Sequence, residues 1–153
     1  MTEFGVLGDR TDWQKDFERR LRASYAAAGL GVPAAERMLE GVRESIGGWT
    51  VAEITDTGTR VGHVAVVVSD DNGALAGRIG DLHVDAPHAA RGHEQAARVW
   101  AEGWCAERGA GRIDIRLTEL AGELFDGYGV RGQIRARRVA SPPEPSATSP
   151  PGR

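Results

Sequence analysis

The chain has 153 residues, of which 41% are hydrophobic and 27% are charged, and its formal net charge is −3. This length suits one domain with a hydrophobic core and is short for two. The net negative charge argues against a general nucleic-acid-binding protein. The sequence has no apolar run near the roughly 20 residues of a membrane-spanning helix, and its acidic start lacks the regions of a signal peptide. We therefore expect a cytoplasmic protein with no membrane partner.

Two amphipathic helices are predicted first. Thr11 and Gln14 have the spacing of a capping box, in which a hydroxyl and an amide side chain satisfy free N–H groups at a helix start. The helix that follows has apolar residues every three or four positions and is expected to end at Gly29 and Gly31. Pro33 suits the first turn of the second helix, because its fixed φ favours that position.

The period then changes to that of strands. Residues 49–54 and 61–68 are β-rich runs separated by a turn at 56–58, and they predict a hairpin whose second strand is buried on both faces. Residues 69–73 are rich in Asp, Asn and Gly and predict a turn before a strand at 78–84. The middle of the chain should therefore supply three consecutive strands.

A third helix is predicted over residues 92–108. Cys105, the only cysteine, lies within its apolar pattern and is interpreted as a buried small hydrophobe. We expect five positions of this helix to face the core: Ala96, Val99, Trp100, Gly103 and Trp104.

The remaining elements are shorter. A strand at 112–117, a short helix at 119–127 and a last strand near 133–139 complete the predicted domain, residues 1–140. The Pro- and Ser-rich segment 141–153 has too little apolar content to offset the entropy of ordering, so it is predicted to be a disordered tail.

The strand, crossover helix and strand between residues 78 and 117 place a helix N-terminus just beyond the end of a strand. Free N–H groups and the helix dipole converge at such a point and favour an anion. Any α/β protein has such places, so this feature alone does not define a function.

Leu82, Val84, Pro87, Arg91 and Gly92 form the pattern Leu-x-Val-x-x-Pro followed by an Arg-Gly pair, at the end of a predicted strand and just before the central helix. This pattern and the order of the predicted elements resemble strand four and the element order of the GNAT acyltransferase superfamily. The resemblance implies an α/β (α+β) fold, with a mixed, mostly antiparallel central sheet and helices on both faces. It also implies acyl transfer from acetyl-CoA, as co-substrate, to a small-molecule or peptide amine in a ternary complex, and it is compatible with a homodimer.

The resemblance also implies where acetyl-CoA binds. In such proteins the pantetheine arm hydrogen-bonds the backbone at the end of strand four, and the diphosphate lies on amides of an Arg/Gln-x-x-Gly-x-Gly/Ala loop. The corresponding residues here are Leu82, His83 and Val84 for the arm, and Arg91, Gly92, His93, Glu94, Gln95 and Ala96 for the loop.

Glu94 departs from the family pattern, because it stands where the loop has its middle glycine. Glycine lets the backbone approach a phosphate without an intervening Cβ, whereas Glu94 adds bulk and a charge that repels the diphosphate. A carboxylate at this helix N-terminus also suits the dipole, and Arg98, one turn further, is expected to pair with it.

Candidate catalytic residues follow from the chemistry of amine attack. A general base must reach the amine proton directly or through one water, and histidine as a residue type titrates near neutral pH. His83 is therefore a candidate base, with Asp81 and Glu53 as alternatives. Phe125 stands where the resemblance places the tyrosine that protonates the leaving thiolate; Tyr128 is either its substitute or a packing residue.

Two other hypotheses remain open. Glu94 and Phe125 also fit a catalytically impaired GNAT-fold module that binds CoA or a protein partner. Arginines around residue 135 suggest nucleic-acid binding, but no aromatic residues are interleaved with them and the net charge argues against it. The four histidines have no metal-ligand spacing, so no metal site is predicted.

Overall fold

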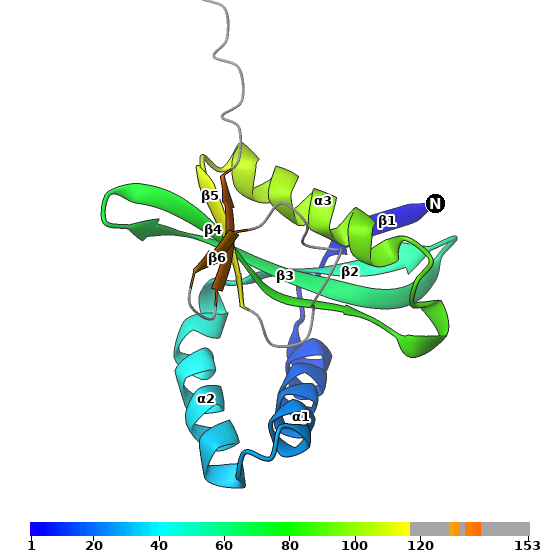
Figure 1. Ribbon diagram of the computed structural model, residues 1–153. Coiled ribbons are helices and arrows are strands. Elements are labelled where there is room, and N and C mark those ends of the chain that lie inside the picture. The colour runs from blue at the N-terminus through cyan, green and yellow to red at the C-terminus, as the bar shows by residue number, and fades with distance from the viewer. Residues whose placement is uncertain (117–128, 132–133, 139–153) are drawn as a thin grey trace, which may run out of the picture.

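The structure is a computed structural model and describes residues 1–116, 129–131 and 134–138. Within these residues a seven-stranded sheet has the strand order β1-β2-β3-β4-β5-β7-β6 (Figure 1). Its strands are β1 (Thr2–Val6), β2 (Thr50–Asp56), β3 (Thr59–Asp71), β4 (Ala74–Val84), β5 (Arg112–Arg116), β6 (Gly129–Arg131) and β7 (Ile134–Arg138). β4 and β5 run parallel, while the other neighbouring pairs are antiparallel. The predicted mixed, mostly antiparallel sheet is confirmed.

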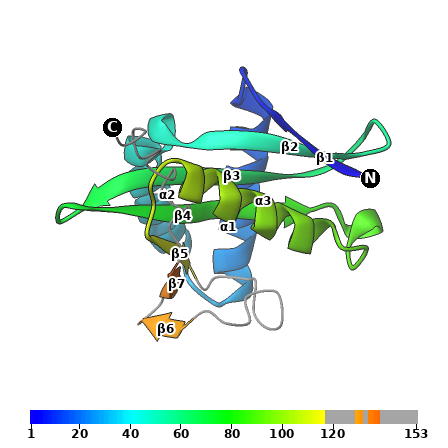
Figure 2. The ribbon, with the colours of Figure 1, turned by 90° about the horizontal axis from the view of Figure 1, so that it is seen from above.

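Helices cover both faces of the sheet, as predicted. α1 (Thr11–Ala27) and α2 (Val32–Ser45) lie below it in Figure 1, and α3 (His93–Glu107) lies above it; Figure 2 shows α3 crossing over β3 and β4. Two short 3-10 turns, η1 (Ile46–Gly48) and η2 (Ala86–His88), precede β2 and follow β4. None of the helices in the described part of the chain has the length and apolar character needed to cross a membrane.

The core has one part on each face of the sheet. On the α3 face the buried residues are Ala52, Ile54, Val61, Val64, Val66, Ile79, Leu82, Ala97, Ala101, Cys105, Ala110, Ile113 and Ile115. On the other face, Trp13 and Phe17 of α1 pack with Ile46, Val51 and Ala65.

The start of α1 differs from the predicted capping box. Thr11 is the first residue of the helix, and Asp9 Oδ1 accepts hydrogen bonds from its backbone N–H at 2.9 Å and from its hydroxyl at 2.7 Å. These two hydrogen bonds hold the pKa of Asp9 below its usual value. A carboxylate accepts from free N–H groups and suits the helix dipole, so Asp9, and not Thr11, satisfies the N-terminus of α1.

Two tight hairpins connect β2, β3 and β4. The predicted hairpin between β2 and β3 is confirmed, with Thr57 and Gly58 at positive φ. The predicted turn at 69–73 is too long, because β3 continues to Asp71 and the turn consists of Asn72 and Gly73, at φ of 56° and 87°. Two consecutive residues at positive φ match the right-handed twist of the flanking strands.

β1 lies outside the elements that the sequence predicted. It forms the edge of the sheet beside β2, and the Phe4 ring stacks on Trp100 of α3 with centroids 5.3 Å apart. Only Phe4 of this short strand makes such a contact, while Val6 is exposed.

α3 packs through small side chains that were not in the predicted stripe and through Trp100 and Trp104, two members of that stripe that are half-buried against the core. Its buried residues are His93, Ala97, Ala101 and Cys105, whereas Val99 is 55% exposed. A Cβ added to Gly77 of β4 would lie 2.7 Å from Cys105 Sγ, so the helix lies close against the sheet. The predicted burial of Cys105 is confirmed, and this burial raises its thiol pKa to about 11.

Candidate functional site

β4 and β5 pair over only the first half of β4. Their parallel register ends at Ile79 and Ile115. Next to this point the register between β4 and β3 shifts, which leaves Gly80 without a partner on β3. Such a bulge bends a strand. Among the described residues, no strand therefore pairs with residues 80–84 on the edge of β4 that faces β5. The backbone N–H and C=O groups on this edge can form hydrogen bonds with a ligand.

The bulge also accommodates a tryptophan. A Cβ added to Gly80 would lie 2.7 Å from two carbon atoms of the Trp49 ring. That ring is held by Trp13 and Phe17, whose ring centroids lie 6.2 and 6.0 Å away.

We expect Gly80→Ala to lower the free energy of unfolding by about 1–3 kcal/mol, because the confined indole must shift. Gly103→Ala is the matched control: a Cβ on this residue of α3 meets nothing within 4 Å, so alanine should stabilise the helix by roughly 0.5–1 kcal/mol. Urea denaturation measures both changes. Equal effects of the two substitutions would contradict the close packing at Gly80.

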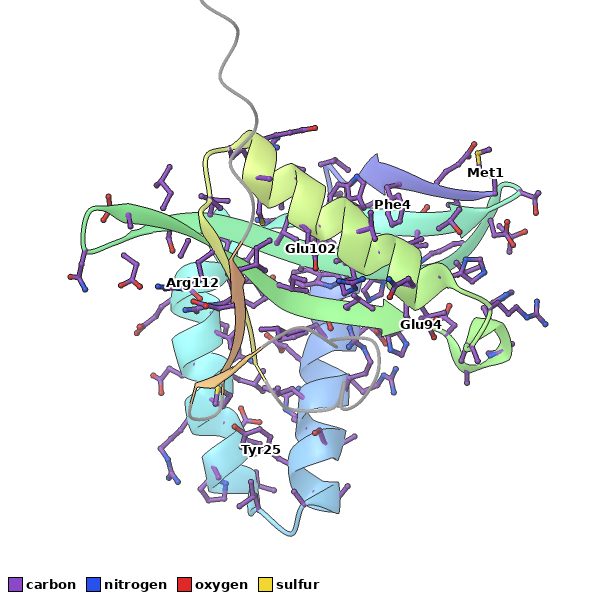
Figure 3. The ribbon with its side chains drawn as sticks, turned by 45° about the horizontal axis from the view of Figure 1, so that its top comes forward. Met1, Phe4, Tyr25, Glu94, Glu102 and Arg112 are labelled. Atoms are coloured by element: carbon purple, nitrogen blue, oxygen red, sulfur yellow. The ribbon has the colours of Figure 1, made fainter. Side chains whose placement is uncertain are left out.

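A cavity of about 820 Å³ lies beside the unpaired half of β4. Its lining includes residues 78–84 of β4, several residues of α1 and α2, Glu94 of α3 and Ile115 of β5. Figure 3 shows Tyr25, another lining residue, between α1 and α2, and Glu94 at the end of α3 near the end of β4. The volume is that of a ligand pocket, so this cavity is the candidate site.

Part of the predicted site lines the cavity. Five predicted residues line it: Asp81, Leu82, His83, Val84 and Glu94. Arg91 is exposed on the loop before α3, and Tyr128 lies outside the described residues. Among the residues that the structure covers, no group of three or more His, Cys, Asp or Glu side chains could hold a metal ion.

His83 lines the cavity and has a carboxylate beside its ring. Its side chain is 31% exposed, and its Nε2 lies 3.3 Å from Asp85 Oδ1. A carboxylate that holds one ring nitrogen orients the imidazole and leaves the other nitrogen for a substrate. Asp85 was not among the predicted site residues. Its spacing could have identified it, because alternate residues of an extended chain share a face and Asp85 is two residues after His83.

Asp81 does not fit the predicted role of a base. Its Oδ1 accepts from Arg20 at 2.8 Å, and its Oδ2 accepts from Arg20 at 2.6 Å and from Trp13 Nε1 at 3.0 Å. The carboxylate is buried, and both oxygens are engaged. Asp81 therefore fixes α1 on β4. Glu53, the other alternative, does not line the cavity, and its Oε2 lies 3.6 Å from Arg60 Nε.

His63 lies beside this ion pair. Its side chain is 1% exposed, with Nε2 3.2 Å from Arg20 Nη2 and Nδ1 3.1 Å from Arg60 Nη2. Burial lowers the pKa of His63 to about 4, and the two arginines act in the same direction. His63 is therefore neutral at pH 7, as expected for a histidine of the core.

We expect acidification from pH 7 to pH 4 to lower the free energy of unfolding by up to about 3 kcal/mol through His63. The unfolded histidine takes up its proton near pH 6.5 and the folded one near pH 4, so the unfolded state binds more protons between these values. Asp16 titrates lower: burial raises its pKa, but hydrogen bonds from Arg20 and Arg19 bring it to about 2. Urea denaturation at several pH values measures the change.

His63→Gln removes this titration and is the comparison variant. Its stability should change less than that of the wild type over the same pH range. An equal loss in both proteins would contradict a neutral His63 in the folded state.

The loop before α3 offers backbone amides to an anion. Gly92, at φ of 89°, precedes the helix, and the N–H of Ala96 already donates to the Gly92 carbonyl at 3.0 Å. The backbone N–H groups of residues 93–95 belong to the first turn of α3, and the N–H groups of a first turn have no carbonyl acceptor within their own helix. The predicted loop therefore retains three helix amides for an anion.

The His93 side chain does not add a donor to this loop. His93 is 4% exposed, its Nδ1 lies 3.1 Å from Thr2 Oγ1, and its Nε2 lies 3.7 Å from Asp56 Oδ2. The imidazole thus packs under α3 and does not reach a ligand on the loop.

Glu94 also has a different partner from the one predicted. Arg98 binds Glu102 at 2.8 Å and Gln95 at 3.3 Å, whereas Glu94 Oε1 accepts from the backbone N–H of Ala90 at 3.3 Å. Glu94 therefore places a carboxylate over the loop in which the resemblance puts the diphosphate.

Comparisons with known proteins support the fold. No protein-family model matches the sequence, and no curated protein sequence matches it. A GCN5-related N-acetyltransferase from Ralstonia eutropha JMP134 has a similar structure, with a TM-score of 0.59 and 22% identity, over 78% of this chain and 86% of its own. A GNAT family acetyltransferase from Brucella melitensis in complex with acetyl-CoA gives a TM-score of 0.57 at 12% identity, over 90% of this chain and 89% of its own.

The chain therefore has the fold of the GNAT acetyltransferases, in agreement with the prediction from its motifs. In this fold the element called strand four in the sequence motif is β4, and the central helix is α3.

Proposed function

We propose that this protein is an acyl-CoA-dependent N-acyltransferase that transfers an acetyl group from acetyl-CoA to a primary amine. The observation that carries the proposal is the position of His83, held by Asp85, in the cavity beside the unpaired half of β4. A thioester and an amine could meet in that cavity next to a base.

The backbone of residues 80–84 suits the pantetheine arm and the thioester. An arm laid along this part of β4 would replace the missing strand partner, as an extended peptide does at a sheet edge. N–H groups directed at the thioester oxygen would stabilise the negative charge that develops there.

The transfer step requires one base and one proton for the leaving group. The amine nitrogen attacks the thioester carbonyl carbon, the carbon–sulfur bond breaks, and CoA leaves as a thiolate. His83 takes the proton that the amine nitrogen loses, and the thiolate gains a proton from solvent or from Tyr128, the donor suggested by the sequence. The products are the acetylated amine and the free thiol of CoA.

The test is the release of CoA thiol from acetyl-CoA in the presence of a panel of primary amines. Amine-dependent release, with a matching mass increase of the acceptor, is the expected result. Absence of release with every amine, under conditions where the protein binds acetyl-CoA, would overturn the proposal.

Glu94 favours a second candidate function, a GNAT-fold module that binds a partner without turnover. Its carboxylate already covers the amide of Ala90, so it competes with a diphosphate for the loop. Two measurements separate the functions. In the release assay this module would liberate no CoA thiol, and in calorimetry with acetyl-CoA it would show no binding that depends on the diphosphate.

A further inference from the structure

The cavity has a cationic side at some distance from His83. Arg37 of α2 and Arg78 of β4 both line it. Neither guanidinium forms a hydrogen bond or an ion pair with another residue that the structure describes. Arg20, the third arginine of the lining, differs from them because Asp81 and Asp16 bind it.

Three acidic side chains near these two arginines are engaged elsewhere. On the helix pair, Glu36 accepts from Arg22 at 2.7 Å, and Glu18 accepts from Arg43 at 2.9 Å. On the sheet, Asp114 is opposite Arg78 in the register of β4 and β5, but its two oxygens accept from Arg112 at 2.9 and 3.1 Å.

The charges along the cavity are therefore asymmetric. Of the acidic side chains in its described lining, Asp81 is neutralised by Arg20, and Glu94 stands at the α3 end. Arg37 and Arg78 form no ion pair with a described residue, although the exposed Glu40 follows Arg37 by three positions on α2. Two unbalanced guanidinium groups attract a carboxylate or a phosphate and repel an additional cation.

We infer that the acceptor amine also carries an anionic group, a carboxylate or a phosphate, which binds Arg37 and Arg78. This inference rests on the proposed function, because it assigns the amine end of the same molecule to His83. Hydroxyl groups of Ser24 and Tyr25 line the same cavity and supply further hydrogen-bond donors for such a group.

The spacing along β4 sets the length of the acceptor. Arg78 and His83 are five residues apart, and the extra residue at the bulge lets both line the same cavity. A strand advances about 3.3 Å per residue, so the Cα atoms of Arg78 and His83 are roughly 16 Å apart. The long arginine side chain can span part of this distance. The anionic group must therefore be separated from the amine by several bonds.

A series of acceptors with the same chain length tests the inference. We propose ε-aminocaproate, the corresponding aminohexyl phosphate, aminohexanol and hexamethylenediamine, each with acetyl-CoA. The anionic acceptors should have a kcat/KM about tenfold or more above that of aminohexanol, and the diamine should have the lowest value, since one charge-assisted contact has roughly this effect. The ratio between the carboxylate and the phosphate identifies the preferred anion.

Three variants identify the residues responsible. Arg37→Gln and Arg78→Gln should each raise KM for the better anionic acceptor about tenfold and leave KM for aminohexanol unchanged. Lys15→Gln is the control, because Lys15 is exposed on α1 and lies outside the described lining of the cavity.

The possible failures are distinguishable. Turnover that favours aminohexanol or the diamine, or KM values unaffected by both arginine variants, would overturn the anionic acceptor and leave acyl transfer intact. Absence of turnover with all four acceptors and with the wider amine panel would overturn the proposed function, and this inference with it.

Discussion

Glu94→Gln is expected to tighten the binding of acetyl-CoA by about tenfold or more. The Glu94 carboxylate lies over the loop before α3, where its Oε1 accepts from the N–H of Ala90. Two like charges about 4 Å apart repel by about 1 kcal/mol in water and by several times more when partly buried. Glutamine keeps an oxygen for Ala90 and removes the charge. Calorimetric titration of acetyl-CoA into both proteins measures the difference.

Two comparisons show whether the effect concerns the diphosphate. Acetyl-pantetheine has no diphosphate, so it should bind the wild type and Glu94→Gln equally. Glu107→Gln makes the same change of net charge at the exposed far end of α3 and should leave acetyl-CoA binding unchanged. Salt should reduce the difference between wild type and Glu94→Gln, because it screens exposed charges. Equal affinities of both proteins for acetyl-CoA at low salt would show that the diphosphate binds away from this carboxylate.

His83→Gln is expected to lower kcat by a factor of about 10² to 10⁴, the usual contribution of a general base. The affinity for acetyl-CoA should stay the same, since the resemblance places only the backbone of this residue against the pantetheine arm. Asp85→Asn should give a smaller loss, because it weakens the orientation of the imidazole but keeps the ring. Steady-state kinetics with a saturating amine, together with calorimetry, separates the two effects.

His88→Gln is the matched control for this substitution. His88 is on η2, five residues further along the chain, and is not among the described lining residues of the cavity. Its kcat should equal that of the wild type. A wild-type kcat in His83→Gln would show that solvent or another group deprotonates the amine.

Much of the fold could be predicted because its signals are local. Pro33 at the start of α2 and the β-rich run of β3 each determine structure within a few residues. β1 gave no such signal, because it is short and depends on pairing with β2 and on the contact between Phe4 and Trp100. The burial of Ala97 and Ala101 of α3 was also missed, since the close approach of the helix to Gly77 favours alanine over the larger apolar residues.

The site was predictable only where the family motif covers it. His83, Leu82 and Val84 lie on the strand that the motif marks, and the structure places all three at the cavity. The partners of Asp81 were not predictable, because Trp13 and Arg20 are more than 60 positions away in the sequence and meet it only through packing.

The attachment of α1 to the sheet bears on how this scaffold could acquire new acceptors. Arg20 and Trp13 fix the first part of α1 on β4 through Asp81, whereas the connection to α2 is exposed, with Leu30 and Val32 at 50% and 75%. The residues that hold the chemistry in place are thus separate from the segment between the two helices. Insertions or replacements near residues 28–32 should therefore shift Tyr25 and Ala34, which line the cavity on either side of this connection, while His83 stays in register.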